Sequence, residues 1–278
     1  MTNGVRLGKQ RLAAALRHAY SLMRARFGHQ HWWPGETPFE ICVGAILTQN
    51  TNWGNVERAI ANLKAARVLE PKKLVALTEK RLAILIHPAG YFNVKARRLR
   101  SFLRVLVEKF DGDLKRLFAG DTPHVRERLL TIHGIGPETA DSMLLYAGHH
   151  LSFVIDAYTK RILHRHGWCG ADATYDHLQK LCAAALETIG RDGNSVGPRT
   201  VPVRSRWGLG LTPASSSSPL QSGALRTGTV RGPTPFAELL DCWQDYHAQL
   251  VMVGKDFCRP REPRCEQCPL RRLLPFGE

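Results

Sequence analysis

Apolar residues recur along most of this chain at the spacing of an α-helix. In the first such stretch, Leu12, Leu16, Tyr20, Met23 and Phe27 follow one another at steps of four, four, three and four residues. This is the period of one buried face of an amphipathic helix. No segment keeps the strict alternation of apolar and polar residues that marks a half-buried strand. The sequence therefore predicts an all-α fold.

Nine further segments carry the same period or begin with a helix-start signal such as Thr234-Pro235. We expect helices over residues 38–48, 52–66, 71–77, 80–86, 93–109, 126–132, 137–146, 156–166 and 235–254. The connectors between most of them are short, as in a bundle of packed helices. The exception is the segment 191–232, which is rich in Gly, Pro, Ser and Thr and has six Arg against one Asp. It is predicted to be a flexible basic insertion, because it has too little apolar surface to offset the entropy of ordering.

The charge of the chain indicates a polyanionic partner. Its 39 Lys and Arg against 24 Asp and Glu leave a formal net charge of +15, which favours nucleic acid or an anionic membrane surface. The longest apolar runs are far shorter than the roughly 20 residues of a membrane-spanning helix. The first residues also lack the apolar core of a signal peptide. We expect a cytoplasmic protein, associated with the nucleoid if bacterial.

A glycine-bearing turn separates two of the expected helices. Gly134, Ile135 and Gly136 precede Pro137, a favoured first residue of a helix. Two glycines allow a tight turn whose backbone amides face outward, and the dipole of the next helix adds a preference for anions. Such a turn can hold a phosphate of a nucleic-acid backbone. The alternative is an ordinary connector between two helices.

The segment HGIGPETA, residues 133–140, followed by Val154, Ile155 and Asp156, resembles the helix-hairpin-helix and Gly/Pro/Asp signature of the endonuclease III superfamily of DNA glycosylases. Two upstream segments agree with it. LTQNT, residues 47–51, resembles the loop that bears a wedge Gln in that family, and GYFNVKA, residues 90–96, resembles another of its motifs. The resemblance runs in order over about residues 30–165.

The resemblance implies two helical domains that flank a DNA-binding cleft. Residues 30–150 would form a six-helix domain with the helix-hairpin-helix, and residues 1–29 and 151–278 a second domain with a Cys loop. The implied function is base-excision repair by a monomeric enzyme. It would hydrolyse the N-glycosidic bond of a damaged base flipped out of double-stranded DNA.

Asp156 is the catalytic residue that the resemblance implies. Loss of the base leaves positive charge on the sugar in the transition state, and a fixed carboxylate gains interaction energy as that charge grows. The same carboxylate is suited to orient the attacking water. The alternative is a helix N-cap, because Asp156 precedes the expected helical residues Ala157, Tyr158 and Thr159.

Glu138 departs from part of the family. Its bifunctional members have a Lys at this position of the hairpin, which forms a Schiff base with the sugar and permits strand cleavage. A carboxylate cannot do so, and we therefore expect a monofunctional glycosylase. Two alternatives remain: a bifunctional enzyme acting on oxidised pyrimidines, and a non-catalytic helix-hairpin-helix DNA-binding protein.

Four residues are expected to form the base pocket: Trp32, Trp33, Pro34 and, further on, Trp53. Their arrangement resembles the 3-methyladenine DNA glycosylase III branch of the superfamily and implies an alkylated base. Indole faces attract a desolvated cationic purine by about 2 kcal/mol. The alternative is that these residues are core aromatics. The chain also departs from the branch, which has Lys where this sequence has Ala157.

Further DNA contacts are implied by the same motifs. Gln49 and Tyr91 stand where the family places its wedge residues. The remaining expected DNA-binding residues are Asn93, Lys95, Gly134, Gly136 and Thr139, with Arg97, Arg98 and Arg100 as further phosphate contacts. The alternative for these basic residues is a solvated helix face.

Three cysteines near the C-terminus match part of a metal-binding motif. Cys258, Cys265 and Cys268 have the spacing of the first three ligands in the family's [4Fe-4S] loop, and the fourth position is Leu274. A cluster could be completed by Cys242, His247 or an exogenous ligand. The alternative is that the loop packs without metal.

Overall fold

The computed structural model describes residues 9–32, 35–187 and 235–275, and these residues form twelve α-helices, three short 3₁₀ turns and no strand. The predicted all-α class is confirmed. The insertion expected over residues 191–232 lies outside the described residues. Within them, no helix combines the length and the apolar character needed to cross a membrane.

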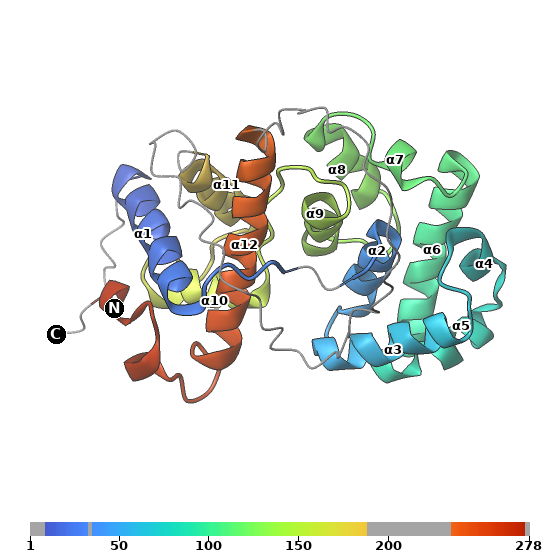
Figure 1. Ribbon diagram of the computed structural model, residues 1–278, viewed down its shortest axis with the longest axis horizontal. Helices are drawn as coiled ribbons and strands as arrows, with labels where there is room; N and C mark the ends of the chain where they lie inside the picture. The colour runs from blue at the N-terminus through green and yellow to red at the C-terminus, as the bar shows by residue number, and fades with distance from the viewer. Residues whose placement is uncertain (1–8, 33–34, 188–234, 276–278) are drawn as a thin grey trace, which may run out of the picture.

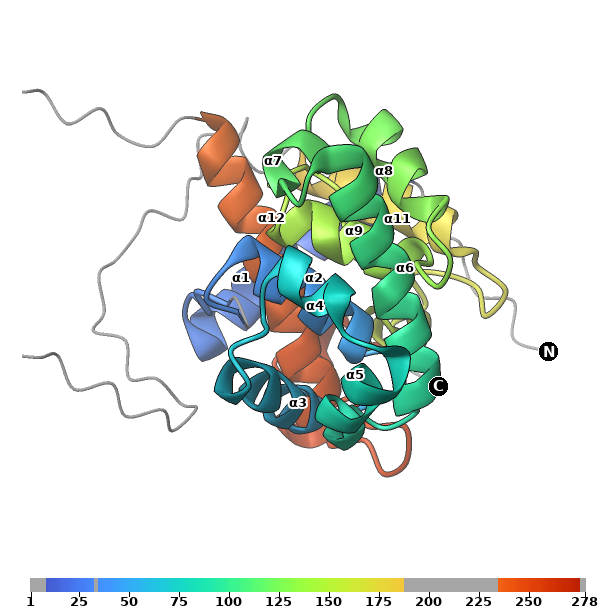
Figure 2. The same cartoon turned by 90° about the vertical axis from the view of Figure 1, so that its right-hand side faces the viewer.

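The helices gather in two groups (Figure 1). One group contains α1 (Lys9–Phe27), α10 (Ala157–Arg165), α11 (Tyr175–Leu186) and α12 (Pro235–Asp256). The other contains α2 (Pro38–Leu47), α3 (Trp53–Ala65), α4 (Pro71–Ala76), α5 (Glu79–Leu85), α6 (Phe92–Phe110), α7 (Leu114–Leu117), α8 (Thr122–Leu130) and α9 (Pro137–Tyr146). The helices α9 and α12 meet where the groups join. Figure 2 shows α4 and α5 beside the long α6, on which both pack.

Local capping chemistry sets several helix starts. Thr37 accepts a hydrogen bond from the backbone of α2, and Thr174 accepts one from the backbone of α11. The helix α11 was not predicted, and neither was the short α7. The helix α8 begins four residues before its predicted start, because Pro123 is favoured in a first turn.

The apolar stripe of α1 is buried against α11 and α12, so this helix has the partner surface that its sequence pattern requires. One buried carboxylate reinforces the contact. Asp245 of α12 accepts hydrogen bonds from the Tyr20 hydroxyl at 2.8 Å, from Arg24 at 3.1 Å and from the backbone amide of Gln30 at 2.7 Å. Because a buried charge needs such partners, this network joins the N-terminal helix to α12.

Candidate active site

The two glycines of the hairpin serve different purposes. Gly134 has a φ of +87°, and a Cβ built there would lie 2.2 Å from the Cγ of Arg98, so no other residue fits without rearrangement. Gly136 is the N-cap of α9 in an extended conformation, and no atom lies within 4 Å of a Cβ built there. The hairpin is therefore packed onto α6 at Gly134 and open at Gly136.

The side chain of Gln49 is bound to this hairpin. Its Nε2 donates to the carbonyl of Gly134 and to the hydroxyl of Thr139, both at 3.0 Å, and its Oε1 accepts from Arg98 at 2.5 Å. Thr139 is itself buried. The structure thus brings together three predicted DNA-binding residues, Gln49, Gly134 and Thr139, and links them to one another.

The start of α6 presents some of its predicted DNA contacts to solvent and buries another. Tyr91 is 71% exposed, with a left-handed φ of 45°, and Asn93 and Arg97 are exposed. Lys95, by contrast, is 1% exposed, and its Nζ donates to the carbonyl of Ala89 at 2.7 Å. Burial and then the charge of Arg98 lower the pKa of Lys95 to about 8.

The expectation that Lys95 contacts phosphate is therefore corrected: its amine secures the 3₁₀ turn His87–Ala89. Two neighbouring arginines are also engaged within the protein. Arg100 donates to the carbonyl of Leu77, and Arg98 holds Gln49. Of the three arginines expected at phosphates, only Arg97 is exposed.

Asp156 has one oxygen engaged and one directed at a second side chain. Its Oδ1 accepts from the backbone amide of Thr159 at 2.7 Å, which makes Asp156 the N-cap of α10. Its Oδ2 lies 3.8 Å from Nε2 of His247, and its side chain is 13% exposed. Asp156 is therefore a helix N-cap, as the alternative interpretation expected, but the cap uses only one of its two carboxylate oxygens.

Glu138 lies close enough to Asp156 for their charges to interact. It occupies the first turn of α9, directly after the hairpin, and is exposed to solvent. The surrounding protein and then the negative charge of Asp156 raise the pKa of Glu138 to about 7. The glycine-bearing hairpin and the carboxyl of Asp156 are therefore neighbours in space.

His247 and Tyr146 form a part of this site that sequence reasoning missed. Tyr146, at the end of α9, places its hydroxyl 2.6 Å from Nδ1 of His247 on α12. The indole of Trp32 lies parallel to the imidazole, with an interplanar angle of 10° and 6.2 Å between ring centres. The sequence did contain one indication of this site, because His247 lies among the apolar residues on the buried face of the predicted helix 235–254.

His247 was considered above as a fourth cluster ligand, and the structure corrects this. His247 precedes Cys258 by eleven residues, a rise of about 16 Å along a helix. Its imidazole is turned to Asp156 and Tyr146. Cys242 is placed one turn further away and interacts with Tyr20 of α1.

The expected base-pocket residues are only partly brought together. Trp32 covers His247, whereas Trp33 and Pro34 lie outside the described residues. Trp53 packs on α2, where a Cβ built at Gly44 would lie 3.2 Å from its ring, and its Nε1 donates to Glu57 at 2.9 Å. The structure thus gives Trp53 a packing role between α2 and α3.

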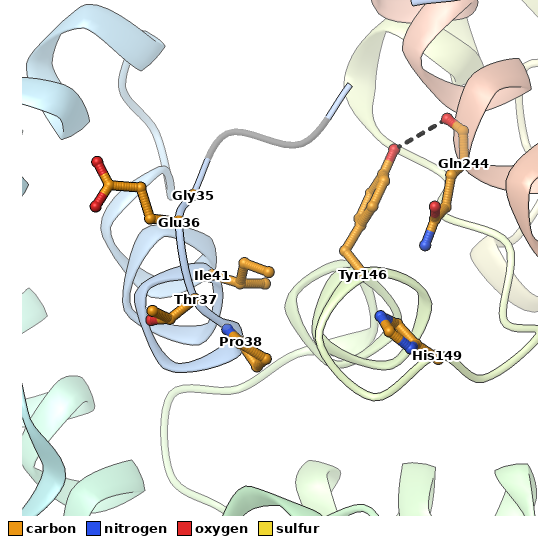
Figure 3. A pocket seen from close by; sticks show the side chains of 8 residues that line it. All are labelled: Gly35, Glu36, Thr37, Pro38, Ile41, Tyr146, His149 and Gln244. Carbon is orange, nitrogen blue, oxygen red and sulfur yellow. Dashed lines mark hydrogen bonds between the residues drawn. The ribbon is translucent and has the colours of Figure 1, made fainter. Parts of the chain in front are cut away.

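A cavity of about 320 Å³ is lined in part by Tyr146 (Figure 3). It is lined by the segment 35–38 and Ile41 at the start of α2, and by Tyr146, His149 and Gln244 across from them. The Tyr146 side chain extends from α9 to the backbone carbonyl of Gln244 on α12, and its hydroxyl also contacts His247. The site therefore has an open space beside one of its residues, Tyr146.

The Cys loop is held by two arginines of α10. Arg161 donates to the carbonyl of Cys258 at 2.6 Å, and Arg165 donates to the carbonyl of Arg259 at 2.6 Å. Arg165 also lies 3.5 Å from the sulfur of Cys258. Cys258 is buried, and the Cys265 and Cys268 side chains are partly exposed.

The donor set of this loop does not fit a four-thiolate cluster. Cys258 and Cys265 are close enough to Cys268 to interact with it electrostatically, so the three side chains lie near one another, but Leu274 supplies no ligand. In the part of the chain that the structure describes, no group of three or more His, Cys, Asp or Glu side chains is placed to hold a metal ion. A [4Fe-4S] cluster is therefore not established for this chain.

Comparison with known proteins places these features in context. The family model described as "HhH-GPD superfamily base excision DNA repair protein" matches residues 43–188. A Methanocaldococcus jannaschii protein whose name assigns it to the DNA repair glycosylases is 36% identical over 256 residues, which cover 91% of this chain and 93% of the relative.

Two solved structures share the fold. The 3-methyladenine DNA glycosylase of H. pylori bound to 1,N6-ethenoadenine has a TM-score of 0.65 and 24% identity, covering 88% of this chain and 97% of that one. A non-covalent endonuclease III–DNA complex has a TM-score of 0.66 and 18% identity, covering 96% of this chain and 95% of that one.

Proposed function

Because the chain belongs to the HhH-GPD superfamily of base excision DNA repair proteins, we propose that it releases an alkylated base from double-stranded DNA without cleaving the strand. The family assignment confirms the resemblance noted in the sequence. The observation that carries the proposal is the pairing of Asp156, with one oxygen free of its cap, and Glu138 at the hairpin.

Asp156 is the proposed catalytic residue. Its Oδ1 is fixed by the Thr159 amide, and this holds the other oxygen in a defined direction. Positive charge grows on the deoxyribose as the bond to the base breaks, and a pre-oriented carboxylate stabilises that charge at no cost of reorganisation. The same oxygen can accept a hydrogen from the water that adds to C1′.

Glu138 supports a hydrolytic rather than a lyase course. A strand-cleaving mechanism through a Schiff base needs an amine next to the sugar, and a carboxyl at this position supplies none. Water is then the nucleophile, and the product is an intact strand with an abasic site. Strand cleavage follows only when the product is treated with alkali.

The hairpin and the exposed start of α6 are the proposed DNA-binding surface. The open backbone at Gly136 and the N-terminus of α9 suit a phosphate. Tyr91 is exposed enough to enter a base stack, with Asn93 and Arg97 beside it. Gln49 would act as a wedge only after leaving its bonds to the hairpin.

The alkylated substrate is supported by the aromatic surroundings of Asp156. Trp32 lies over His247, and indole faces bind cationic purines by stacking and by cation–π attraction. Such a base is a good leaving group and needs little acid catalysis. The H. pylori neighbour is named for 3-methyladenine and agrees with this choice.

We also propose the division of the chain into the domains 30–150 and 1–29 with 151–278. The grouping of helices in Figure 1 supports this division. For the Cys loop we propose a purely structural role, in which Arg161 and Arg165 hold the loop in place of a complete cluster. Its exposed arginines, such as Arg261 and Arg264, would then face the DNA backbone.

The test is a set of duplexes that each hold one defined lesion, incubated with the purified protein and scored with and without alkali. We expect breaks at an alkylated purine only after alkali treatment. Breaks at oxidised pyrimidines without alkali would instead identify a bifunctional enzyme. Binding of all duplexes without release of any base would leave a DNA-binding protein and overturn the proposal.

A further inference from the structure

The buried imidazole of His247 has one nitrogen paired and the other unpaired. Its Nδ1 lies 2.6 Å from the Tyr146 hydroxyl. Its Nε2 is buried and has no hydrogen-bond partner among the described residues, although it lies 3.8 Å from Oδ2 of Asp156. A buried donor or acceptor left unpaired costs free energy, so we ask whether this nitrogen gains a partner when substrate binds.

The tautomer of His247 follows from its surroundings. Burial lowers the pKa of His247 against the opposing effect of Asp156, so the ring is neutral and has one N–H. Burial holds the pKa of Tyr146 well above its ordinary value, so the phenol keeps its hydrogen. The hydroxyl donates to the carbonyl of Gln244 at 3.3 Å and lies closer to Nδ1, at 2.6 Å, so its hydrogen can be shared between the two. The carboxylate of Asp156 faces Nε2 at 3.8 Å and would repel a lone pair there, which favours a hydrogen on Nε2. We therefore assign the N–H of His247 to Nε2.

The ring is also held in place by its aromatic neighbours. The face of Trp32 lies parallel to it, and the ring of Phe153 meets it at 89° with 6.3 Å between centres. A rotation of the imidazole would change its packing against both rings and break the contact with Tyr146. The direction of Nε2 is thus set by packing from three residues.

Nε2 of His247 faces Oδ2 of Asp156, and this carboxylate is held in place through its Oδ1. Oδ1 of Asp156 is bound to the Thr159 amide, which leaves Oδ2 as the atom nearest to His247. The separation of 3.8 Å exceeds a hydrogen bond by about 1 Å. Hydrogen bonds in active sites are often long before substrate binds and shorten in the complex.

We propose that His247 is a positioning residue for Asp156: its Nε2–H binds Oδ2 when a damaged nucleotide fills the site, and Tyr146 holds the imidazole in the tautomer that can do so. The proposal rests on the proposed function of Asp156. In this proposal the carboxylate of Asp156 belongs to a series of interacting side chains, Tyr146, His247 and Asp156, which connects α9, α12 and α10.

The first experiment reads the tautomer directly and does not depend on activity. In the ¹⁵N-labelled full-length protein, long-range ¹H–¹⁵N spectra at pH 7 should show His247 neutral with its hydrogen on Nε2. In Tyr146→Phe, the loss of the phenol donor should remove this preference for Nε2. An Nδ1–H tautomer in the wild type would overturn the proposal.

The second experiment measures single-turnover base release and DNA affinity for three variants. In His247→Leu the rate should fall roughly tenfold to a hundredfold, the effect of a lost hydrogen bond to a charged group, with DNA affinity within about threefold of wild type. His247→Gln, whose amide can reach the Nε2 position, should recover much of the rate. Tyr146→Phe keeps the ring and the packing, and its rate should also fall.

The matched control is His166, another buried histidine, whose nitrogens lie 2.8 Å and 3.3 Å from the carbonyl oxygens of Ile162 and Leu270. It lies at the other end of α10, about 15 Å from Asp156 along the helix. His166→Leu should lower thermal stability but keep the rate of base release per folded molecule. Equal rates in wild type, His247→Leu and Tyr146→Phe would refute the positioning role, whereas an inactive wild type would refute the proposed function itself.

Discussion

Glu138 and Asp156 are coupled by their charges, although they belong to different helices. Glu138 is in the first turn of α9, and Asp156 caps α10. Although Glu138 is exposed, partial desolvation by the surrounding protein and then the negative charge of Asp156 raise its pKa to about 7. A carboxyl that titrates near neutral pH at the proposed site gives the protein a measurable dependence on pH.

The first prediction concerns stability between about pH 4.5, the ordinary pKa of a glutamate, and about pH 7. In this range the folded protein holds a proton on Glu138 more tightly than the unfolded chain does, so the contribution of Glu138 to stability falls as the pH rises. The variant Glu138→Gln has no ionisable group at this position and so lacks this pH-dependent contribution to stability. Denaturant unfolding at several pH values should show wild type losing stability relative to Glu138→Gln as the pH increases. Parallel curves for the two proteins would show that the pKa of Glu138 is not raised.

The second prediction concerns strand cleavage. Wild type should not be trapped on lesion-containing DNA by borohydride, because Glu138 provides no amine for a Schiff base. Glu138→Lys places an amine directly after the hairpin and should yield a covalent complex, which gel electrophoresis detects. The control Glu138→Gln should remain untrapped. Efficient trapping of wild type would mean that another amine serves as nucleophile.

The third prediction compares the two glycines of the hairpin. Gly134→Ala should lower the free energy of unfolding by at least about 2 kcal/mol, because it combines a left-handed backbone with a clash against Arg98. Gly136→Ala has open space and an extended backbone, so its stability should stay within about 1 kcal/mol of wild type.

The Gly136→Ala variant, which should keep its stability, should lose affinity for DNA. The methyl group of Gly136→Ala would occupy the space proposed for a phosphate, so this variant should bind an abasic-site duplex several-fold more weakly while remaining folded. Unaltered affinity in Gly136→Ala would place the phosphate contact elsewhere.

The fourth prediction concerns iron. Wild type purified without oxygen should hold far less than four iron atoms per chain, because Leu274 leaves the loop one thiolate short. Leu274→Cys should gain iron and the visible absorbance of a cluster on reconstitution. A full complement of iron and inorganic sulfide in wild type would show that a ligand other than residue 274 completes the site.

Local chemistry explains what the sequence could predict. The helices followed from the apolar period and from Pro and Gly at their ends, and α9 was predicted with both of its bounds. The neighbourhood of the hairpin and Asp156 followed from residues only about twenty positions apart, where motif and proximity go together. The short α7, with four residues, has too few positions to display a period.

Contacts between distant segments were beyond such reasoning. Asp156 and His247 are separated by 91 positions, and no local pattern shows that α12 returns to the N-terminus of α10. Lys95 was misjudged for a related reason: the motif indicated its position on α6, but only the packed structure shows that its amine turns inward to Ala89. Long-range side-chain contacts are set by how the helices pack, and the motif alone does not specify this.

The most direct test of the account is the rate of base release by Asp156→Asn. Asn caps a helix about as well as Asp, so the free energy of unfolding should change by no more than about 1 kcal/mol. The affinity for an abasic-site duplex should be retained. The single-turnover release of an alkylated purine should fall at least about a hundredfold, because the charge that stabilises the sugar is gone. A folded Asp156→Asn protein that releases the base at nearly the wild-type rate would contradict the account and leave Asp156 as a helix cap alone.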